Sequence, residues 1–528
     1  MSDFNNDIGQ QLHRFHGGLQ LRHYKQISCT ESPPFIAVPK QLVVPLQQHA
    51  GLIAEPCVEV GQRVLRGQRI ASAQSGISAH LHAPSSGTVS AIEARWVHHE
   101  LRCQAVIIDC DGLDEAVALT PLNGWTQSAP ESVVSHLQAM GVVGLGGAVF
   151  PSAQKIHQSL HQEQNIHTVI LNGAECEPYL SCDESLMLSR PEEVIRGAQI
   201  LCHAAQAQQV IIAIEDRMTE VEKRLLQCIK TKNLSHSQVV QVPTYYPEGG
   251  ERQLIQVLTG EEVPSGGYPQ DLGLVCFNVA TAQASFKAVE HGEPLIQRLV
   301  TVTGQSVQHP GNWWARLGTP VDDLLRAAGG LQQAVDRIVM GGPIMGRCLI
   351  DTQAPVVKAS NCILALSNAE VHDPQGELPC INCGFCVRVC PARLLPQELH
   401  WAVRSQQLDR ARDYGLMDCI ECGCCDQICP SHIALVEDYR LGKHQLRVQQ
   451  QEQQRAQLAK QRYEARQERL QQREAALAAR RQVRKSPASK PLDAKARIAA
   501  ALAKKRQQKA AQQATNTTPP TSSDEDRS

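Results

Sequence analysis

The 528-residue sequence lacks several features that would place it in common classes of protein. It has no run of about 20 apolar residues, the length needed to cross a bilayer. The first 18 residues, MSDFNNDIGQQLHRFHGG, are polar and contain no apolar stretch with a small-residue cleavage site. Aromatic residues make up only 4% of the chain. We therefore expect neither membrane-spanning helices nor secretion. In a reducing cytosol, spaced cysteines are more often metal ligands or catalytic thiols than halves of disulfides.

Charge is distributed unevenly along the chain. The formal net charge is −2, but residues 444–510 hold 18 Lys or Arg against 5 Asp or Glu, which makes that stretch +13. The last 18 residues contribute −2, so residues 1–443 carry −13. The length predicts about three or four domains. The charge pattern predicts an acidic globular body with a basic tail.

Nine of the 20 cysteines lie in two short segments, CINCGFCVRVC at 380–390 and CIECGCCDQIC at 419–429. Each has the spacing C-x2-C-x2-C-x3-C and each is followed by proline. A 4Fe–4S cluster needs four thiolates. A loop with this spacing supplies three, and in two-cluster ferredoxins the fourth is the last cysteine of the other copy. The sequence therefore predicts two clusters, one held by Cys380, Cys383, Cys386 and Cys429, the other by Cys419, Cys422, Cys425 and Cys390.

The alternative interpretation of these cysteines is a pair of zinc sites. Zinc normally takes two CxxC pairs that lie far apart in the chain, so four cysteines in eleven residues favour the clusters. Cys424 lies off the spacing, and we expect it to be a small packed residue. The cysteines outside the two segments are expected to fill the core.

A glycine-rich segment, GVVGLGGAVFPSAQK at 141–155, precedes an amphipathic stretch. Glycines at this place let backbone N–H groups approach a phosphate closely, and a helix N-terminus adds a favourable dipole. A glycine-rich turn without a ligand remains the alternative. The segment HTVILNGAECEPY at 167–179 favours a ligand site over a turn without a ligand, because its short buried strand ends in Asn172, Glu175 and Glu177. Open α/β sheets place ligands at the carboxyl ends of their strands.

Three further segments continue the pattern. VIIAIED at 210–216 predicts a second buried strand, and YYPEGGERQLI at 245–255 and CFNVATA at 276–282 predict turns that close the same crevice. Carboxylates in such a crevice can accept hydrogen bonds from the N–H and ribose hydroxyl groups of a flavin or nicotinamide nucleotide.

The motifs GLGGAVFPSAQK, NGAECEPY, YPEGGERQL and FNVATA, in this order and followed by two ferredoxin repeats, resemble the RnfC family of the Rnf-type electron transport complex. That is a membrane complex that couples electron transfer to ion translocation. The motifs are also distantly similar to those of the flavin-binding NADH subunit of respiratory complex I. The resemblance covers roughly residues 30–440.

The resemblance implies FMN in a Rossmann-like domain, NAD(H) stacked over it, and two clusters that pass electrons onward. Carried over by position, Gly144, Gly146, Gly147 and Lys155 would line the flavin phosphate and ribityl chain. Asn172 and Glu175 would contact the isoalloxazine edge, and Glu177 the nicotinamide nucleotide, with Glu175 and Glu177 as the catalytic pair. Gly250, Glu251 and Asn278 would complete the pocket.

One departure from the family's pattern concerns residue 149. The family usually reads GGAGF, whereas this chain has GGAVF with Val149. If the position requires a positive φ or a close approach to the ligand, the β-branched side chain costs ~1 kcal/mol or more.

The predicted fold class is a multidomain α/β and α+β chain. Residues 1–32 form an N-terminal segment, and 33–120 a barrel-sandwich hybrid domain of biotinyl or lipoyl type, with an unrelated small β domain as the alternative. No lysine occurs between Lys40 and Lys155, so the attachment residue is missing. Residues 121–297 form the Rossmann-like FMN and NAD domain, 298–366 a β-grasp (SLBB) module, and 367–435 an α-helical two-cluster ferredoxin domain. Residues 436–528 form a helical basic tail with a disordered C-terminus.

The basic tail has several possible roles. It could lie on anionic lipid, bind an acidic partner, bind nucleic acid or stay solvated, and the solvated helix is the expectation favoured by its lack of an apolar stripe. An acidic body without a nucleic-acid motif argues against nucleic acid.

The function predicted from the sequence is electron transfer between NAD(H), FMN and two 4Fe–4S clusters, within an ion-translocating oxidoreductase. The expected partners are the other subunits of that complex, including a ferredoxin-like subunit, and the expected location is peripheral, on the cytoplasmic side of the inner membrane. The alternatives are an iron–sulfur relay with an inactive nucleotide pocket and a reductase component that acts on a redox regulator.

Overall fold

The computed structural model describes residues 8–98, 101–160, 165–232, 234, 236–371, 376–485 and 494–514. The chain divides into two compact units, Met1–Gln445 and Leu446–Ser528. The C-terminal residues expected to be disordered lie outside the described part. No helix within the described ranges is both long and apolar enough to span a bilayer.

The first unit begins with a small β module. One sheet has the order β1 (Gln41–Pro45), β7 (Leu101–Cys110), β6 (Gly87–His98) and β3 (Arg63–Val64). The other has the order β2 (Glu55–Pro56), β4 (Arg69–Ser72) and β5 (Leu81–His82). Apolar side chains from both sheets, among them Leu42, Val64, Ile70, Leu81 and Ile108, are fully buried in one core. Alternation along short strands thus builds a barrel-like sandwich, as predicted.

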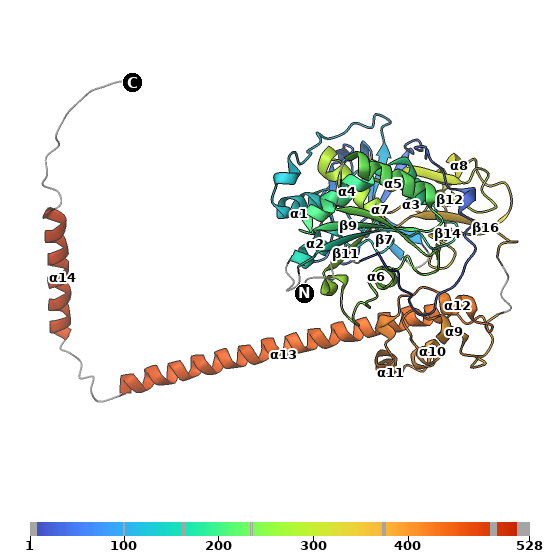
Figure 1. The fold of residues 1–528 in the computed structure, drawn as a ribbon. Helices are drawn as coiled ribbons and strands as arrows, with labels where there is room; N and C mark the ends of the chain where they lie inside the picture. Colours follow the sequence, from blue (N-terminus) through green and yellow to red (C-terminus); the bar gives the residue numbers. More distant parts are fainter. Residues whose placement is uncertain are drawn as a thin grey trace, which may run out of the picture. The chain divides into compact units, whose positions relative to one another are not determined.

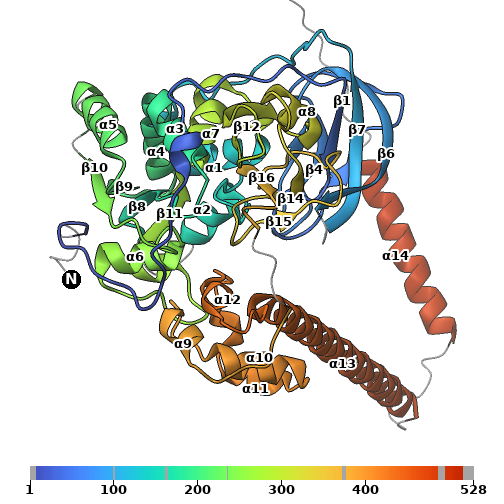
Figure 2. The same cartoon turned by 90° about the vertical axis from the view of Figure 1, so that its right-hand side faces the viewer.

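A parallel sheet follows, in the order β10 (Ser237–Val242), β9 (Gln209–Glu215), β8 (Thr168–Gly173) and β11 (Leu274–Asn278). Its central strands are continuous apolar runs, because helices cover both faces. One face carries α1 (Pro130–Ala139), α2 (Ser152–Leu160), α3 (Cys182–Ser189), α4 (Pro191–Ala204), α5 (Thr219–Lys232) and α7 (Val279–Phe286). The other face carries α6 (Glu251–Thr259), seen opposite these helices in Figures 1 and 2.

A third module holds a five-stranded sheet of order β13 (Gly311–Arg316), β12 (Gln297–Thr303), β16 (Cys362–Ser367), β14 (Val335–Met340) and β15 (Arg347–Cys348). Only the β12–β16 pair is parallel among these described pairings. Helix α8 (Val321–Ala327) packs on the sheet through Val321 and Leu324. This is the strand, turn, helix and strand arrangement predicted for the β-grasp module. Trp314 is buried and stacks on Phe35, which agrees with a packing role.

Each cysteine-rich segment ends in a short helix, α9 (Phe385–Val389) in the first and α12 (Cys424–Ile428) in the second. Between them lie α10 (Pro396–Arg404) and α11 (Leu408–Asp413), and the four helices are grouped beyond α6 in both views (Figures 1 and 2). Single-turn helices occur at Lys25–Ile27, Trp125–Gln127, Pro269–Leu272 and Leu416–Asp418, and a π-helical turn at Lys287–His291.

Helix α13 (Leu435–Lys485) belongs to both units. Its first turns bury Val436, Tyr439 and Lys443 against the cysteine-bearing helices, so the first unit includes the start of this helix and extends to Gln445. In the second unit Leu446 is buried, and the described side chains from residue 450 onward in α13 and in α14 (Ala494–Ala514) are exposed. Without an apolar stripe, this part of the chain has few apolar side chains to bury.

The N-terminal segment runs across the first unit. Ile8 packs into the core beneath α6, and Leu19 pairs with Tyr246. The amide of Gly18 donates to the carbonyl of Val389 at 2.9 Å. The segment therefore ties the parallel-sheet domain to the cysteine-bearing helices.

Candidate functional site

A cavity of about 480 Å³ opens at the carboxyl ends of β8 and β11. Apart from Gly147, every residue predicted for the nucleotide site lines it: Gly144, Gly146, Lys155, Asn172, Glu175, Glu177, Gly250, Glu251 and Asn278. These side chains come from four separate motifs. The parallel sheet brings them together because its strands all end at this edge.

The glycine-rich segment forms one wall of the cavity. The amide of Gly144 donates to the carbonyl of Phe150, and the amide of Leu145 donates to Thr281 Oγ1. The next three amides, 146–148, donate no hydrogen bond to any residue that the structure describes. Successive amides without an internal acceptor form a concave site for an anion such as a phosphate group.

Residue 149 has a left-handed backbone conformation, which suits glycine and is unusual for valine. Val149 has φ 44°, in the left-handed region, and Gly147 has φ 109°. A non-glycine residue in this region stores about 1–3 kcal/mol. Val149 is only partly buried, and its side chain packs beside the core of the parallel-sheet domain. The chain therefore accommodates valine at a position that favours glycine.

Three polar side chains cross-link the cavity walls. Lys155 Nζ donates to Glu251 Oε1 at 2.5 Å and to the carbonyl of Cys276 at 2.6 Å. Asn172 Nδ2 donates to the carbonyl of Gly249 at 2.8 Å. The N-cap side chain of α7, Asn278, donates to Asp183 at 2.6 Å. Glycine at 249 is required by space, since a Cβ there would lie 2.4 Å from the carbonyl oxygen of Ala174.

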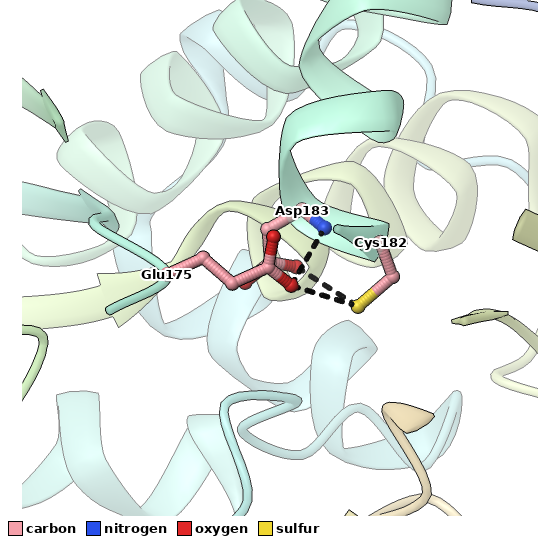
Figure 3. Close-up of side chains that lie close together, drawn as sticks. All are labelled: Glu175, Cys182 and Asp183. Atoms are coloured by element: carbon pink, nitrogen blue, oxygen red, sulfur yellow. Dashed lines mark hydrogen bonds between the residues drawn. The ribbon is translucent and has the colours of Figure 1, made fainter. Parts of the chain in front are cut away.

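Figure 3 shows Glu175, from the turn after β8, beside Cys182 and Asp183 at the start of α3. Glu175 Oε1 accepts from Cys182 Sγ at 3.3 Å and from the amide of Asp183 at 3.2 Å. Burial raises the pKa of Glu175 to about 7, while the charge of Lys25 works in the opposite direction. Glu175 can therefore hold or release a proton near neutral pH at the cavity wall.

Two buried cations compensate these carboxylates. Lys25 lies 1% exposed with its Nζ 3.9 Å from Glu175 Oε2, and it donates to the backbone carbonyls of Glu175 and Leu180. Arg298 is also buried, and its positive charge favours the ionised form of Asp183. The group of Glu175, Cys182 and Asp183 has the spacing of metal ligands, but its negative charge is already matched by side chains.

Glu177 is engaged by the β-grasp module. Its Oε1 accepts from the amides of Ile344 and Met345 at 2.9 and 2.7 Å, in the loop between β14 and β15. Burial raises the pKa of this carboxyl, and the two amides lower it. One Glu177 oxygen thus holds a loop of the cavity wall.

The cysteines of the two segments surround two further cavities. One is lined by Cys380, Cys383, Cys386 and Cys429, and the other by Cys390, Cys419, Cys422 and Cys425. The off-spacing Cys424 also lines the second cavity. Apart from it, each cavity has three thiols from one segment and the last cysteine of the other. Four converging thiols are the ligand set that a 4Fe–4S cluster requires, so the residues fit two such clusters. Cys424 is fully buried.

The second cysteine cavity adjoins the larger one. Cys422 and the neighbouring Ile420 line both the cysteine cavity and the 480 Å³ cavity. Tyr246 Oη, buried between them, donates to the carbonyl of Cys422 at 2.5 Å. At the other segment Cys383 is exposed. One cysteine set thus lies beside the large cavity and the other reaches the surface.

Several residues of the site carry no signal in the sequence. Lys25, Asp183 and Arg298 act through burial beside a charge, and no motif or spacing marks them.

Four family profiles match consecutive parts of the chain. They are described as "RnfC Barrel sandwich hybrid domain" over residues 13–113, "Nuo51 FMN-binding domain" over 137–286, "SLBB domain" over 299–347 and "4Fe-4S dicluster domain" over 379–433. The predicted fold class is confirmed, as are FMN and two 4Fe–4S clusters as cofactors. The first profile begins inside the N-terminal segment, where residues 19–25 contact the parallel-sheet domain.

Curated relatives extend over most of the chain. A protein of Pseudomonas aeruginosa, named as the C component of an ion-translocating oxidoreductase complex, is 43% identical over 89% of this chain and 60% of its own length. A protein of the same name from Salmonella dublin is 42% identical over 93% of this chain and 69% of its own. The chain thus spans about 60% of the length of the Pseudomonas protein.

Among solved structures, an NAD⁺-reducing [NiFe]-hydrogenase superposes with a TM-score of 0.43 at 17% identity, over 60% of this chain and 63% of that one. A similarity of this size indicates no shared function.

Proposed function

This chain belongs to the RnfC family of ion-translocating oxidoreductase complexes, and we propose that it relays electrons between NAD(H), FMN and two 4Fe–4S clusters within such a complex. The observation that carries the proposal is the shared wall formed by Ile420 and Cys422. It joins the nucleotide cavity to a set of four cysteines.

The cavity fits a flavin mononucleotide in its chemistry. The unengaged amides at 146–148 suit the phosphate, with Gly144 and Lys155 beside them. Asn172 and Glu175 would hold the ring edge, and Gly250, Glu251 and Asn278 the opposite wall. When bound, FMN exchanges a hydride with a nicotinamide and single electrons with iron–sulfur clusters.

Each acidic residue has a distinct task in this proposal. The Glu175 carboxyl, whose pKa burial raises to about 7, can accept or donate a proton at the cavity wall. Glu177 has one oxygen committed to the loop at Ile344 and Met345, so it is the second oxygen that could meet a nicotinamide nucleotide.

The cysteine sets lie in an order that suits one-electron transfer outward. The set of Cys390, Cys419, Cys422 and Cys425 adjoins the nucleotide cavity, and the set of Cys380, Cys383, Cys386 and Cys429 reaches the surface at Cys383. A partner that docks on that surface would exchange electrons with the outer set. We infer that the partners are other subunits of the complex, among them one of ferredoxin type. We also infer that the chain binds peripherally at the cytoplasmic side of the inner membrane.

The test is an anaerobic titration of the purified, cluster-loaded chain with NADH. Flavin absorbance and the EPR signals of the clusters are followed together, after FMN and iron have been quantified. We expect about eight irons, bound FMN and changes in both signals. Eight irons with no FMN and no response to NADH would contradict the proposal and support a relay whose nucleotide cavity is inactive.

The variant Val149→Gly tests whether valine at this position weakens the binding of FMN. Val149→Gly removes the left-handed strain at φ 44°, about 1–3 kcal/mol in the segment beside the phosphate site. If valine weakens the site, the variant should retain FMN about ten-fold more tightly, as measured by equilibrium dialysis. Unchanged retention would show that the cavity already binds FMN as fully as the glycine form does.

A further inference from the structure

The glycine-rich segment 141–150 is held from behind at three carbonyls. Lys358 Nζ donates to the carbonyl of Gly141 at 2.7 Å, and Arg298 Nη2 donates to that of Leu145 at 3.3 Å. The amide of Ala50 donates to the carbonyl of Val149 at 3.1 Å. These donors come from the β-grasp and the barrel-sandwich modules, so the segment's shape depends on domains outside the parallel sheet.

Lys358 lies where three modules meet. It is 1% exposed, and besides Gly141 its Nζ donates to the carbonyl of His80 at 3.3 Å. Its amide donates to Gln48 Oε1 at 3.1 Å, and its own carbonyl accepts from Arg298 Nη1. Through these contacts the two cations form one unit behind the glycine-rich segment.

The position of Lys358 is costly for a charged side chain. In the described residues no carboxylate forms an ion pair with it, and burial lowers the pKa of Lys358 to about 7. The histidines around it, His49, His80 and His82, have lowered pKa values because of burial, with Lys358 adding to the effect. An unpaired buried amine opposes folding, so the lysine is not explained by stability.

We propose that Lys358 and Arg298 are positioning residues that hold the carbonyls of Gly141 and Leu145 away from the cavity, so that amides 146–148 are preorganised for the phosphate of a flavin mononucleotide. The inference rests on the proposed function, and it adds that phosphate recognition depends on cations that do not touch the ligand. Carbonyls turned toward these cations cannot oppose an anion on the other side. In a buried setting the cations also favour negative charge at the amides.

The experiment compares FMN with riboflavin, which lacks the phosphate. The full-length, cluster-loaded protein is freed of flavin, and both affinities are measured by quenching of flavin fluorescence in the parent chain and in Lys358→Met. We expect the parent to prefer FMN, and Lys358→Met to reduce that preference about ten-fold, the effect of one lost charge-assisted hydrogen bond. Binding of riboflavin should be unchanged. The melting temperature should change little, because removal of a buried amine that has no ion pair offsets the loss of its hydrogen bonds to the carbonyls of Gly141 and His80.

Two further variants make the result specific. Lys223→Met removes an exposed lysine of α5, and it should leave both affinities unchanged. Arg298→Lys keeps the charge but loses the fork that reaches both Leu145 and Lys358, so it should reduce the preference for FMN about three-fold. This variant also tests the inference if Lys358→Met does not fold.

The outcomes separate the inference from the proposed function. A parent chain that binds neither flavin contradicts the proposed function and the inference with it. A parent that prefers FMN, with the same preference in Lys358→Met and Arg298→Lys, overturns the inference and leaves the proposed function standing. Equal loss of FMN and riboflavin binding would also overturn it, because that pattern reports general disorder of the cavity.

Discussion

The two cysteine-rich loops are nearly identical in backbone and differ in surroundings. Both place their third and fifth residues in the left-handed region, Asn382 and Gly384 in one loop and Glu421 and Gly423 in the other. In both, a short helix follows. The shared cysteine spacing and glycine therefore determine the loop, which keeps its backbone although its third residue is Asn in one copy and Glu in the other.

What differs is the neighbourhood of each loop. Ile381 is 67% exposed, and a Cβ at Gly384 would meet nothing within 4 Å. Ile420 and Gly423, in the other loop, lie against the nucleotide cavity and Ile344. The first loop thus faces solvent and the second packs against the rest of the first unit. The two sequences do not indicate which loop is exposed.

The largest expected effect tests the crossed cysteine sets. Replacing Cys429 by serine should remove about four irons, and the remaining EPR spectrum should match that of Cys386→Ser, a change in the other loop. Cys390→Ser should match Cys422→Ser in the same way. Iron analysis and EPR of the four variants check the assignment. Spectra that group by loop, Cys429→Ser with Cys422→Ser, would contradict it.

A matched pair of glycines measures the difference in surroundings directly. Gly384→Ala and Gly423→Ala share the cost of a positive φ, about 1–2 kcal/mol. Only Gly423→Ala also brings a Cβ to 2.5 Å from Ile344 Cγ2, which should add about 1–3 kcal/mol of overpacking. Thermal unfolding of the two variants gives the difference. Equal destabilisation would mean that the second loop is no more closely packed than the first.

The smallest expected effect concerns Tyr246, which donates a hydrogen bond to the second cysteine-rich loop. Tyr246→Phe removes the hydrogen bond to the Cys422 carbonyl and should destabilise the first unit by about 1 kcal/mol. Tyr463→Phe, on the exposed part of α13, serves as the control and should change stability by less than about 0.5 kcal/mol. Chemical denaturation followed by circular dichroism checks both. If Tyr246→Phe is as stable as the control, this hydrogen bond does not stabilise the wall that the two cavities share.

The sequence predicted most of what depends on local chemistry. The spacing of the cysteines led to the two sets that surround the two cavities, and the motif order led to the residues that line the large cavity. Both succeed because a loop or a strand end imposes requirements on adjacent residues. At position 149 the sequence raised a positive φ only as a condition, and the structure shows it at Val149.

The remaining features depend on contacts between distant segments. Lys25, Arg298 and Lys358 are ordinary basic residues in the sequence, and each acquires its role only through burial beside a carboxylate or a carbonyl. The commitment of Glu177 to the loop at Ile344 and Met345 was likewise invisible. Desolvation is a property of the assembled core, so no local pattern could have indicated these residues.

The N-terminal segment has a consequence for the order in which the chain folds. His16 bonds to the carbonyl of Cys390, a contact between residues 374 positions apart, and Gly18 donates to Val389. On the ribosome these partners are made long after the segment itself, so it must wait undocked while the intervening modules form. Its closure is a long-range step with a large entropic cost, and it comes late in folding. The segment is therefore made before the helices that it contacts and docks after them.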